Sequence, residues 1–228
     1  MFFPIILVAP ARAENVGAAA RAMKTMGFTQ LRIVNSQVHR EPAAHWTAHG
    51  ATEILDNAET FATLQDALAD IDFSIATTAR SRAKFRYYAT PTEVLEQLRE
   101  KREWMSRFAL VFGCEESGLS NADLDCVDLL TGIPMAVDYP SLNLGQAVMV
   151  FCYQLSVLNL EPQVSSSSEP SQQLLALRQR ISQLLDSLEV SDDQKLVEWI
   201  EQRLGFAQKR DTAMLHRLVQ DIEKKLAK

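Results

Sequence analysis

Three short segments of this chain combine residue types that bind ligands and assist group transfer. The first carries Asn15, Gly17 and Arg21, the second spans residues 112–119 and contains Glu115, and the third spans residues 140–145. Amide, carboxylate and guanidinium groups orient hydroxyls or hold phosphates, and glycine lets the main chain approach a ligand closely. Each segment alone is also what a capped helix or a tight turn needs. Their order and spacing together suggest one enzyme site.

The first segment follows an apolar run and opens a helical pattern. Main-chain N–H groups at a helix N-terminus favour an anion, so we expect a phosphate there. Arg21 lies about one and a half turns further along the helix and is expected to reach the same phosphate as a bidentate clamp. The three alanines at positions 18–20 indicate close packing against another element or another subunit.

Residues 77–88 form a basic and aromatic segment in a chain that is acidic overall. Arg80, Arg82, Lys84 and Arg86 stand there among three aromatic residues. Cations contact phosphates and aromatic rings stack on unpaired bases, a combination suited to single-stranded RNA. A solvated basic loop is the competing interpretation.

The elements that must position these segments follow from the hydrophobic pattern. Apolar runs at residues 3–8, 31–34, 73–77, 109–112 and 129–134 predict strands, and helical periodicity at 16–26, 64–69, 91–105 and 142–158 predicts helices. This alternation is typical of an α/β fold, a parallel sheet with helices on both faces. Ligands of such sheets bind outside the carboxyl ends of the strands, where all three segments fall.

The chain divides into a domain of residues 1–160, a linker rich in Ser and Pro at 161–172, and a helical C-terminal extension at 173–228. Three amphipathic patterns make up the extension. A segment this short has little core of its own, so we expect it to dock on the main domain or on a second subunit.

Composition narrows the function classes. The 228 residues are 47% hydrophobic and carry a net charge of −6, which argues against a non-specific nucleic-acid binder. The pattern predicts no signal peptide and no membrane span. Three cysteines without CxxC spacing and four unclustered histidines predict neither disulfides nor a metal site, and we expect a cytoplasmic protein. Neither a dinucleotide fingerprint nor a Walker loop is present.

The three segments resemble the motifs of the SPOUT superfamily of RNA methyltransferases. They are similar to Asn-x-Gly-x-x-x-Arg, Phe-Gly-x-Glu-x-x-Gly-Leu and Ser-Leu-Asn of its SpoU/TrmH branch, and most similar to the TrmJ and LasT-like subgroup. The resemblance covers residues 1–160. It implies a C-terminal trefoil knot, S-adenosyl-L-methionine as cofactor, a homodimer with the site near its interface, and RNA as partner, with tRNA favoured over rRNA.

The resemblance also implies residue roles. The cofactor would be held by Thr77, Thr78, Ala79, Gly113, Glu115, Ile133, Ser141, Leu142 and Asn143. The catalytic residues would be Arg21, Asn15, Glu115 and Asn143, with Arg21 also binding RNA beside the basic segment. Two positions depart from the family: Cys114 stands where close relatives often have Arg, and Gly145 replaces a second Ser of the third motif.

The expected reaction is methyl transfer to a ribose 2′-oxygen, without a metal. A guanidinium stays protonated, so we expect Arg21 to hold the 3′-phosphate and stabilise the developing alkoxide, while phosphate or water takes the proton. Three alternatives remain open: base methylation, a binding protein of the same fold that has lost turnover, and a different α/β enzyme that uses a nucleotide cofactor.

Overall fold

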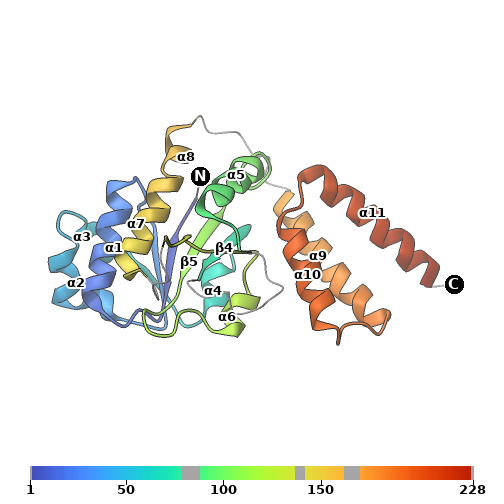
Figure 1. The fold of residues 1–228 in the computed structure, drawn as a ribbon, viewed down its shortest axis with the longest axis horizontal. Helices are drawn as coiled ribbons and strands as arrows, with labels where there is room; N and C mark the ends of the chain where they lie inside the picture. Colours follow the sequence, from blue (N-terminus) through green and yellow to red (C-terminus); the bar gives the residue numbers. More distant parts are fainter. Residues whose placement is uncertain (1, 79–87, 137–141, 162–169, 227–228) are drawn as a thin grey trace.

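The computed structural model describes residues 2–78, 88–136, 142–161 and 170–226. Within these ranges, six parallel strands form one sheet with the order β3-β2-β1-β5-β4-β6 (Figure 1). The strands are β1 (Ile5–Val8), β2 (Leu31–Val34), β3 (Glu59–Phe61), β4 (Phe73–Thr77), β5 (Phe108–Phe112) and β6 (Leu129–Thr131). The predicted parallel α/β sheet is confirmed, with β3 as an added strand.

Strand β3 escaped the hydrophobic pattern because it lies at the edge of the sheet and pairs only with β2. Glu59 and Thr60 are exposed and Phe61 is half-buried. A short edge strand needs no apolar run, so periodicity gives no signal for it.

Helices cover both faces of the sheet. Helices α1 (Ala13–Thr25), α2 (Pro42–Thr47), α3 (Thr52–Asp56), α5 (Pro91–Lys101) and α7 (Leu144–Leu155) contribute to the core on one face, and α4 (Leu64–Leu68) and α6 (Asn121–Asp125) to the core on the other. Ile5 and Leu7 of β1 point into the first core, and Ile6 and Val8 into the second. Every residue of β1 is therefore buried, as in a sheet covered on both sides.

Several helix ends differ from the pattern. The predicted helix at 142–158 is two helices, α7 and α8 (Val157–Leu160), and α1 begins three residues before the predicted start. Helix α5 begins where expected, at a capping box formed by Thr90 and Glu93. A short 3₁₀ helix, η1 (Val38–Arg40), precedes α2.

The C-terminal region consists of α9 (Pro170–Ser187), α10 (Gln194–Gly205) and α11 (Lys209–Leu226), and extends to one side of the sheet (Figure 1). Helix α9 begins within the residues predicted as linker. A small core joins the three helices, made of Leu177, Leu184, Leu204 and Val219.

This region also docks on the α/β domain through polar contacts. Nζ of Lys101, which is 1% exposed, donates to the carbonyl oxygen of Ala207 at 3.1 Å and lies 4.7 Å from the centre of the Phe73 ring. Burial lowers the pKa of Lys101 to about 8. Arg178 forms an ion pair with Asp128 at 2.5 Å. No helix in the described ranges is long and apolar enough to cross a membrane.

Candidate active site

A chain of hydrogen bonds joins one residue from each of the three segments. Nδ2 of Asn15 donates to Oε1 of Glu115 at 2.8 Å, and Nδ2 of Asn143 donates to Oδ1 of Asn15 at 2.7 Å. The two hydrogen-bonded pairs are separated by 100 and 128 positions in the sequence. The carboxyl ends of β1 and β5, which are neighbours in the sheet, bring the first two segments together. The start of α7 brings the third.

Glu115 lies beside the start of α1, near the place where the sequence predicts a phosphate. Its Oε2 accepts the N–H of Ala11 at 2.8 Å, and its Oε1 accepts the N–H of Arg12 at 3.3 Å, at the start of α1. Burial favours the neutral carboxyl, but these hydrogen bonds and the one from Asn15 outweigh it and lower the pKa of Glu115. The carboxylate therefore binds the two main-chain N–H groups just before the first residue of α1, and a phosphate at the N-terminus of the helix stays a prediction.

Asn143 holds the start of α7 as well as Asn15. Its Oδ1 accepts the N–H of Gly145 at 2.9 Å, and its own N–H donates to Oε1 of Gln146 at 3.2 Å, which completes a capping box. Capping and the contact with Asn15 use different atoms of one side chain. Asn143 therefore caps α7 and contacts Asn15 at the same time.

The glycines of the motifs serve packing. A Cβ on Gly17 would lie 2.0 Å from the carbonyl oxygen of Ala44, because α1 and α2 are in close contact there. A Cβ on Gly113 would lie 2.3 Å from the main chain of Gly118, where the loop after β5 closes on itself. The expected approach of a ligand to Gly17 is replaced by the approach of α2.

Gly145 has a similar explanation. A Cβ there would lie 2.8 Å from the Cβ of Ala18 on α1. The serine that the wider family places at this position would not fit against Ala18 without a shift. The departure from the family motif is therefore matched by the packing of α7 on α1.

The predicted cofactor residues that the structure describes lie at the carboxyl ends of three adjacent strands. Thr77 ends β4, Gly113 follows β5 and Ile133 follows β6, and the sheet order places these strands side by side. Oγ1 of Thr77 donates to the carbonyl oxygen of Val111 at 3.1 Å. The N–H of Thr78 donates to the carbonyl oxygen of Thr131 at 2.9 Å. Ala79 and Ser141 lie outside the described residues.

The predicted RNA-binding residues fall into two groups. Arg21 is exposed on α1 and lies beyond the hydrogen-bonded chain along the helix. Among the described residues, Arg21 forms no ion pair with the Glu115 carboxylate. Arg80, Arg82, Lys84 and Arg86 lie outside the described residues.

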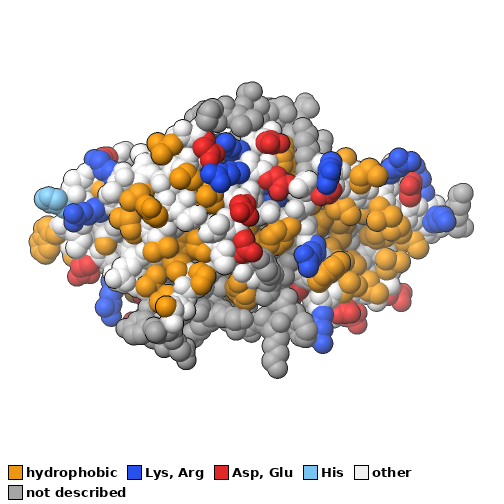
Figure 2. Space-filling model, turned by 45° about the horizontal axis from the view of Figure 1, so that its top comes forward, with side chains coloured by type: hydrophobic (Ala, Val, Ile, Leu, Met, Phe, Trp, Pro, Cys, Tyr) orange, Lys and Arg blue, Asp and Glu red, His pale blue; other side chains and the backbone are white. Residues whose placement is uncertain are grey.

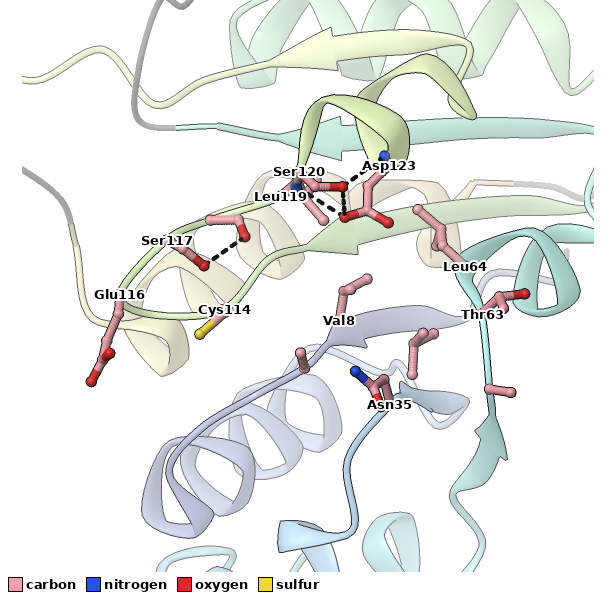
Figure 3. A pocket seen from close by; sticks show the side chains of 14 residues that line it. Val8, Asn35, Thr63, Leu64, Cys114, Glu116, Ser117, Leu119, Ser120 and Asp123 are labelled. Atoms are coloured by element: carbon pink, nitrogen blue, oxygen red, sulfur yellow. Dashed lines mark hydrogen bonds between the residues drawn. The ribbon is translucent and has the colours of Figure 1, made fainter.

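A cavity that the sequence did not reveal lies beside this site, on the β2 side of the loop after β5 (Figure 3). Its volume is about 760 Å³. Asn35, at the end of β2, and Cys114 and Asp123 are among its polar lining residues. Asn35 has a φ of +51°, a conformation that asparagine tolerates better than most residues. The sequence feature that could have indicated Asn35 is its position directly after a buried strand.

Comparisons with known proteins agree with the geometry. Residues 3–153 match the SpoU rRNA Methylase family, and residues 171–226 match the C-terminal domain of the tRNA/rRNA methyltransferase LasT. The chain is 61% identical to the tRNA/rRNA methyltransferase LasT of Escherichia coli K12 over 228 residues, which is 100% of this chain and 100% of that protein.

Relatives with more specific names match as well. The tRNA (cytidine-2′-O-)-methyltransferase TrmJ of Methanocaldococcus jannaschii is 39% identical over 154 residues, which is 66% of each protein. The crystal structure of TrmJ from Z. mobilis ZM4 superimposes with a TM-score of 0.69 at 27% identity, over 98% of this chain and 100% of that one. The chain therefore belongs to the SpoU rRNA Methylase family, in its TrmJ and LasT-like group of S-adenosylmethionine-dependent tRNA/rRNA methyltransferases.

Proposed function

We propose that this protein methylates a ribose 2′-oxygen of tRNA. The observation that carries the proposal is the hydrogen-bonded chain from Glu115 through Asn15 to Asn143. It fixes three loops at the carboxyl ends of the strands, beside the loops that follow β4 and β6. The name of the M. jannaschii relative supports tRNA as the substrate class and the 2′-oxygen as the target. With tRNA as the substrate, we propose that the protein acts in the cytoplasm.

The loops after β4, β5 and β6 fit an adenosine-containing methyl donor. A Cβ on Gly132 would lie 3.0 Å from the carbonyl oxygen of Thr78, so main-chain groups of two loops are close together there. Ile133 and Leu142 are only partly buried and supply apolar surface. We assign cofactor binding to Thr77, Thr78, Gly113, Ile133, Leu142 and Asn143, with Ala79 and Ser141 by analogy to the family. When bound, S-adenosylmethionine supplies an electrophilic methyl group on a sulfonium.

The residues of this chain position the acceptor and stabilise charge. The 2′-hydroxyl loses its proton as the new O–C bond forms, and a phosphate or water takes that proton. Arg21 remains a cation and stabilises the developing oxyanion while it holds the 3′-phosphate. Asn15 is held on both sides by Glu115 and Asn143, so its orientation is fixed before the substrate arrives.

A trefoil knot is part of the proposal. The N–H of Ala89 donates to the carbonyl oxygen of Leu130 at 2.9 Å, so the chain after β4 returns to lie beside β6. Strand β6 is at an edge of the sheet, whereas Asn143 contacts Asn15 near the end of β1. The segments that would thread the proposed knot include residues 79–87 and 137–141, which lie outside the described residues.

We also propose a homodimer that packs through α1 and α7. Figure 2 shows hydrophobic side chains over the part of the surface that these helices form. Tyr153 of α7 is 67% exposed and Val150 is 36% exposed. Arg21 follows Ala18 by less than one turn on the adjacent face of α1. A second subunit packed there would place Arg21 at the interface.

The test is the variant Arg21→Ala. We expect methyl transfer to tRNA to fall by about 10²-fold or more, the usual cost of removing one charge-stabilising donor, while binding of S-adenosylhomocysteine stays unchanged by calorimetry. Arg40→Ala is the matched control, because Arg40 is also exposed and lies on η1. The tRNA should come from a strain that lacks this gene, and mass spectrometry of its nucleosides identifies the product. A methylated base, or full activity of Arg21→Ala, would contradict the proposal.

A further inference from the structure

The cavity beside the active site is large enough to hold a planar ring and has both apolar and polar lining residues. Its volume of about 760 Å³ falls within the usual range for small-molecule sites. Val8 and Val34, at the ends of β1 and β2, belong to the apolar lining, together with Leu64, Leu119 and two alanines. Figure 3 shows Val8 and Asn35 facing Ser120 and Asp123 across it, with Cys114 at one end and Leu64 at the other.

Two polar side chains of the cavity have hydrogen-bonding capacity to spare. Oδ2 of Asp123 interacts with Ser120 at the start of α6, but Oδ1 accepts no hydrogen bond from the described residues. The Asn35 amide is exposed and forms no side-chain hydrogen bond within the described part of the chain. One carboxylate oxygen and a free amide together offer two acceptors and one donor group.

The charges of the lining select against an anion. Of the lining residues, Asp123 is acidic and faces the cavity, and none is Lys or Arg. A phosphate would be repelled, whereas a neutral ring that carries an amino group matches the Asp123 carboxylate. Cytosine, adenine and guanine present such an amino group, and uracil does not.

The position of the cavity connects it to the RNA. Strand order reverses between β1 and β5, and ligands of α/β sheets bind at such a reversal. The loop after β5 separates the two sites: Gly113 adjoins the proposed cofactor loops, and Cys114 lines the cavity.

We propose that this cavity binds an unpaired, amino-bearing base of the substrate RNA, next to the nucleotide that is methylated, and cytosine and adenine serve as the test bases. Asp123 accepts a hydrogen bond from the amino group, Asn35 pairs with the ring edge, and the four apolar side chains contact the ring faces. The inference rests on the proposed function for the source of the base. It also explains Cys114, because an arginine there would bring a cation to the end of the cavity.

Protection of Cys114 from alkylation tests the inference without measuring activity. The experiment uses the full chain with Cys126→Ser, since Cys126 is also partly exposed. Cys152 is fully buried, and burial raises its pKa to about 12, so it stays unreactive. Iodoacetamide labelling of the Cys114 peptide is followed by mass spectrometry with cytidine, adenosine, uridine, ribose 5-phosphate or S-adenosylhomocysteine present.

We expect saturating cytidine or adenosine to slow labelling at least fivefold, and uridine and ribose 5-phosphate to leave it within twofold of the free protein. Equal protection by cytidine and uridine would overturn the assignment to an amino-bearing base. Protection by S-adenosylhomocysteine as strong as that by adenosine would place the cofactor there and overturn it too.

Asn35→Gly supplies the matched variant. Glycine keeps the φ of +51° and removes only the amide, so the fold should be retained. We expect Asn35→Gly to lose the protection, and Glu116→Gln to keep it because the Glu116 carboxylate points away from the cavity (Figure 3). Methyl transfer without nucleoside protection would refute this inference alone, and protection without methyl transfer would refute the proposed function alone.

Discussion

Glu115 links the end of β5 to the start of α1, and the substitution Glu115→Gln removes part of that link. The amide oxygen of glutamine can replace Oε1 and keep the bonds from Asn15 and Arg12. Its NH₂ group would then face the N–H of Ala11, where Oε2 now accepts at 2.8 Å. One charge-assisted hydrogen bond is lost and two donors are brought together.

The expected cost follows from these contacts. A hydrogen bond to a charged group contributes about 1.5–3 kcal/mol, and solvent screening of this half-buried carboxylate reduces that to about 1–2 kcal/mol. With a urea m-value of about 3 kcal/mol/M, the midpoint of unfolding should fall by about 0.5 M. The fluorescence of Trp104, which is 3% exposed, reports on unfolding of the α/β domain.

The pH dependence gives a second, independent check. The folded-state pKa of Glu115 lies below its ordinary value of 4.5, so its stabilising contribution is present above pH 4.5 and is lost as the pH falls through the folded-state pKa. The difference between wild type and Glu115→Gln should therefore be full at pH 7 and shrink in acid. Glu116→Gln is the control, since Glu116 is exposed. An unchanged midpoint at pH 7, or a difference that persists undiminished at pH 3, would refute the reasoning.

Three further predictions concern packing and buried charge. Gly145→Ser should lower the free energy of unfolding by about 1–3 kcal/mol through overpacking against Ala18. Urea unfolding should show a smaller loss when Ala18→Gly is also present. Equal losses with and without Ala18→Gly would count against this contact. Asp70→Asn should cost about 1–2 kcal/mol at pH 7, because Arg32 is buried and bonded to both carboxylate oxygens of Asp70, while solvent screens the exposed Asp70 side chain. Arg32 and Arg107 lower the pKa of Asp70 to about 2, so this cost should vanish only as the pH falls from about 4 to 2; a gap that closes near pH 5 would disagree. Burial lowers the pKa of Lys101 to about 8, so the free energy of unfolding should rise by on the order of 3 kcal/mol as the pH increases from about 8 to 10.5. Urea denaturation at pH 7.5 and at pH 10 should show this rise in the wild type and not in Lys101→Met. An unchanged rise in the variant would exclude Lys101 as its source.

Much of the fold could be predicted from local sequence because buried parallel strands and amphipathic helices leave periodic hydrophobic patterns. Strands β1, β2 and β5 are buried throughout and were readily predicted. The half-exposed strand β3 and the short helices α2 and α3 were not. Elements of three to six residues carry too few positions for a period to show.

The sequence by itself determined the fold class, the family and the residues of the three motifs, because these depend on residue type and spacing. Only the tertiary structure decided how the motif residues interact. It showed that Glu115 accepts main-chain N–H groups just before α1, that Gly17 accommodates α2, and that Asn35 and Asp123 share a cavity. These contacts join residues far apart along the chain, and their distances depend on how strands and helices pack. Local sequence patterns carry no information on such distances.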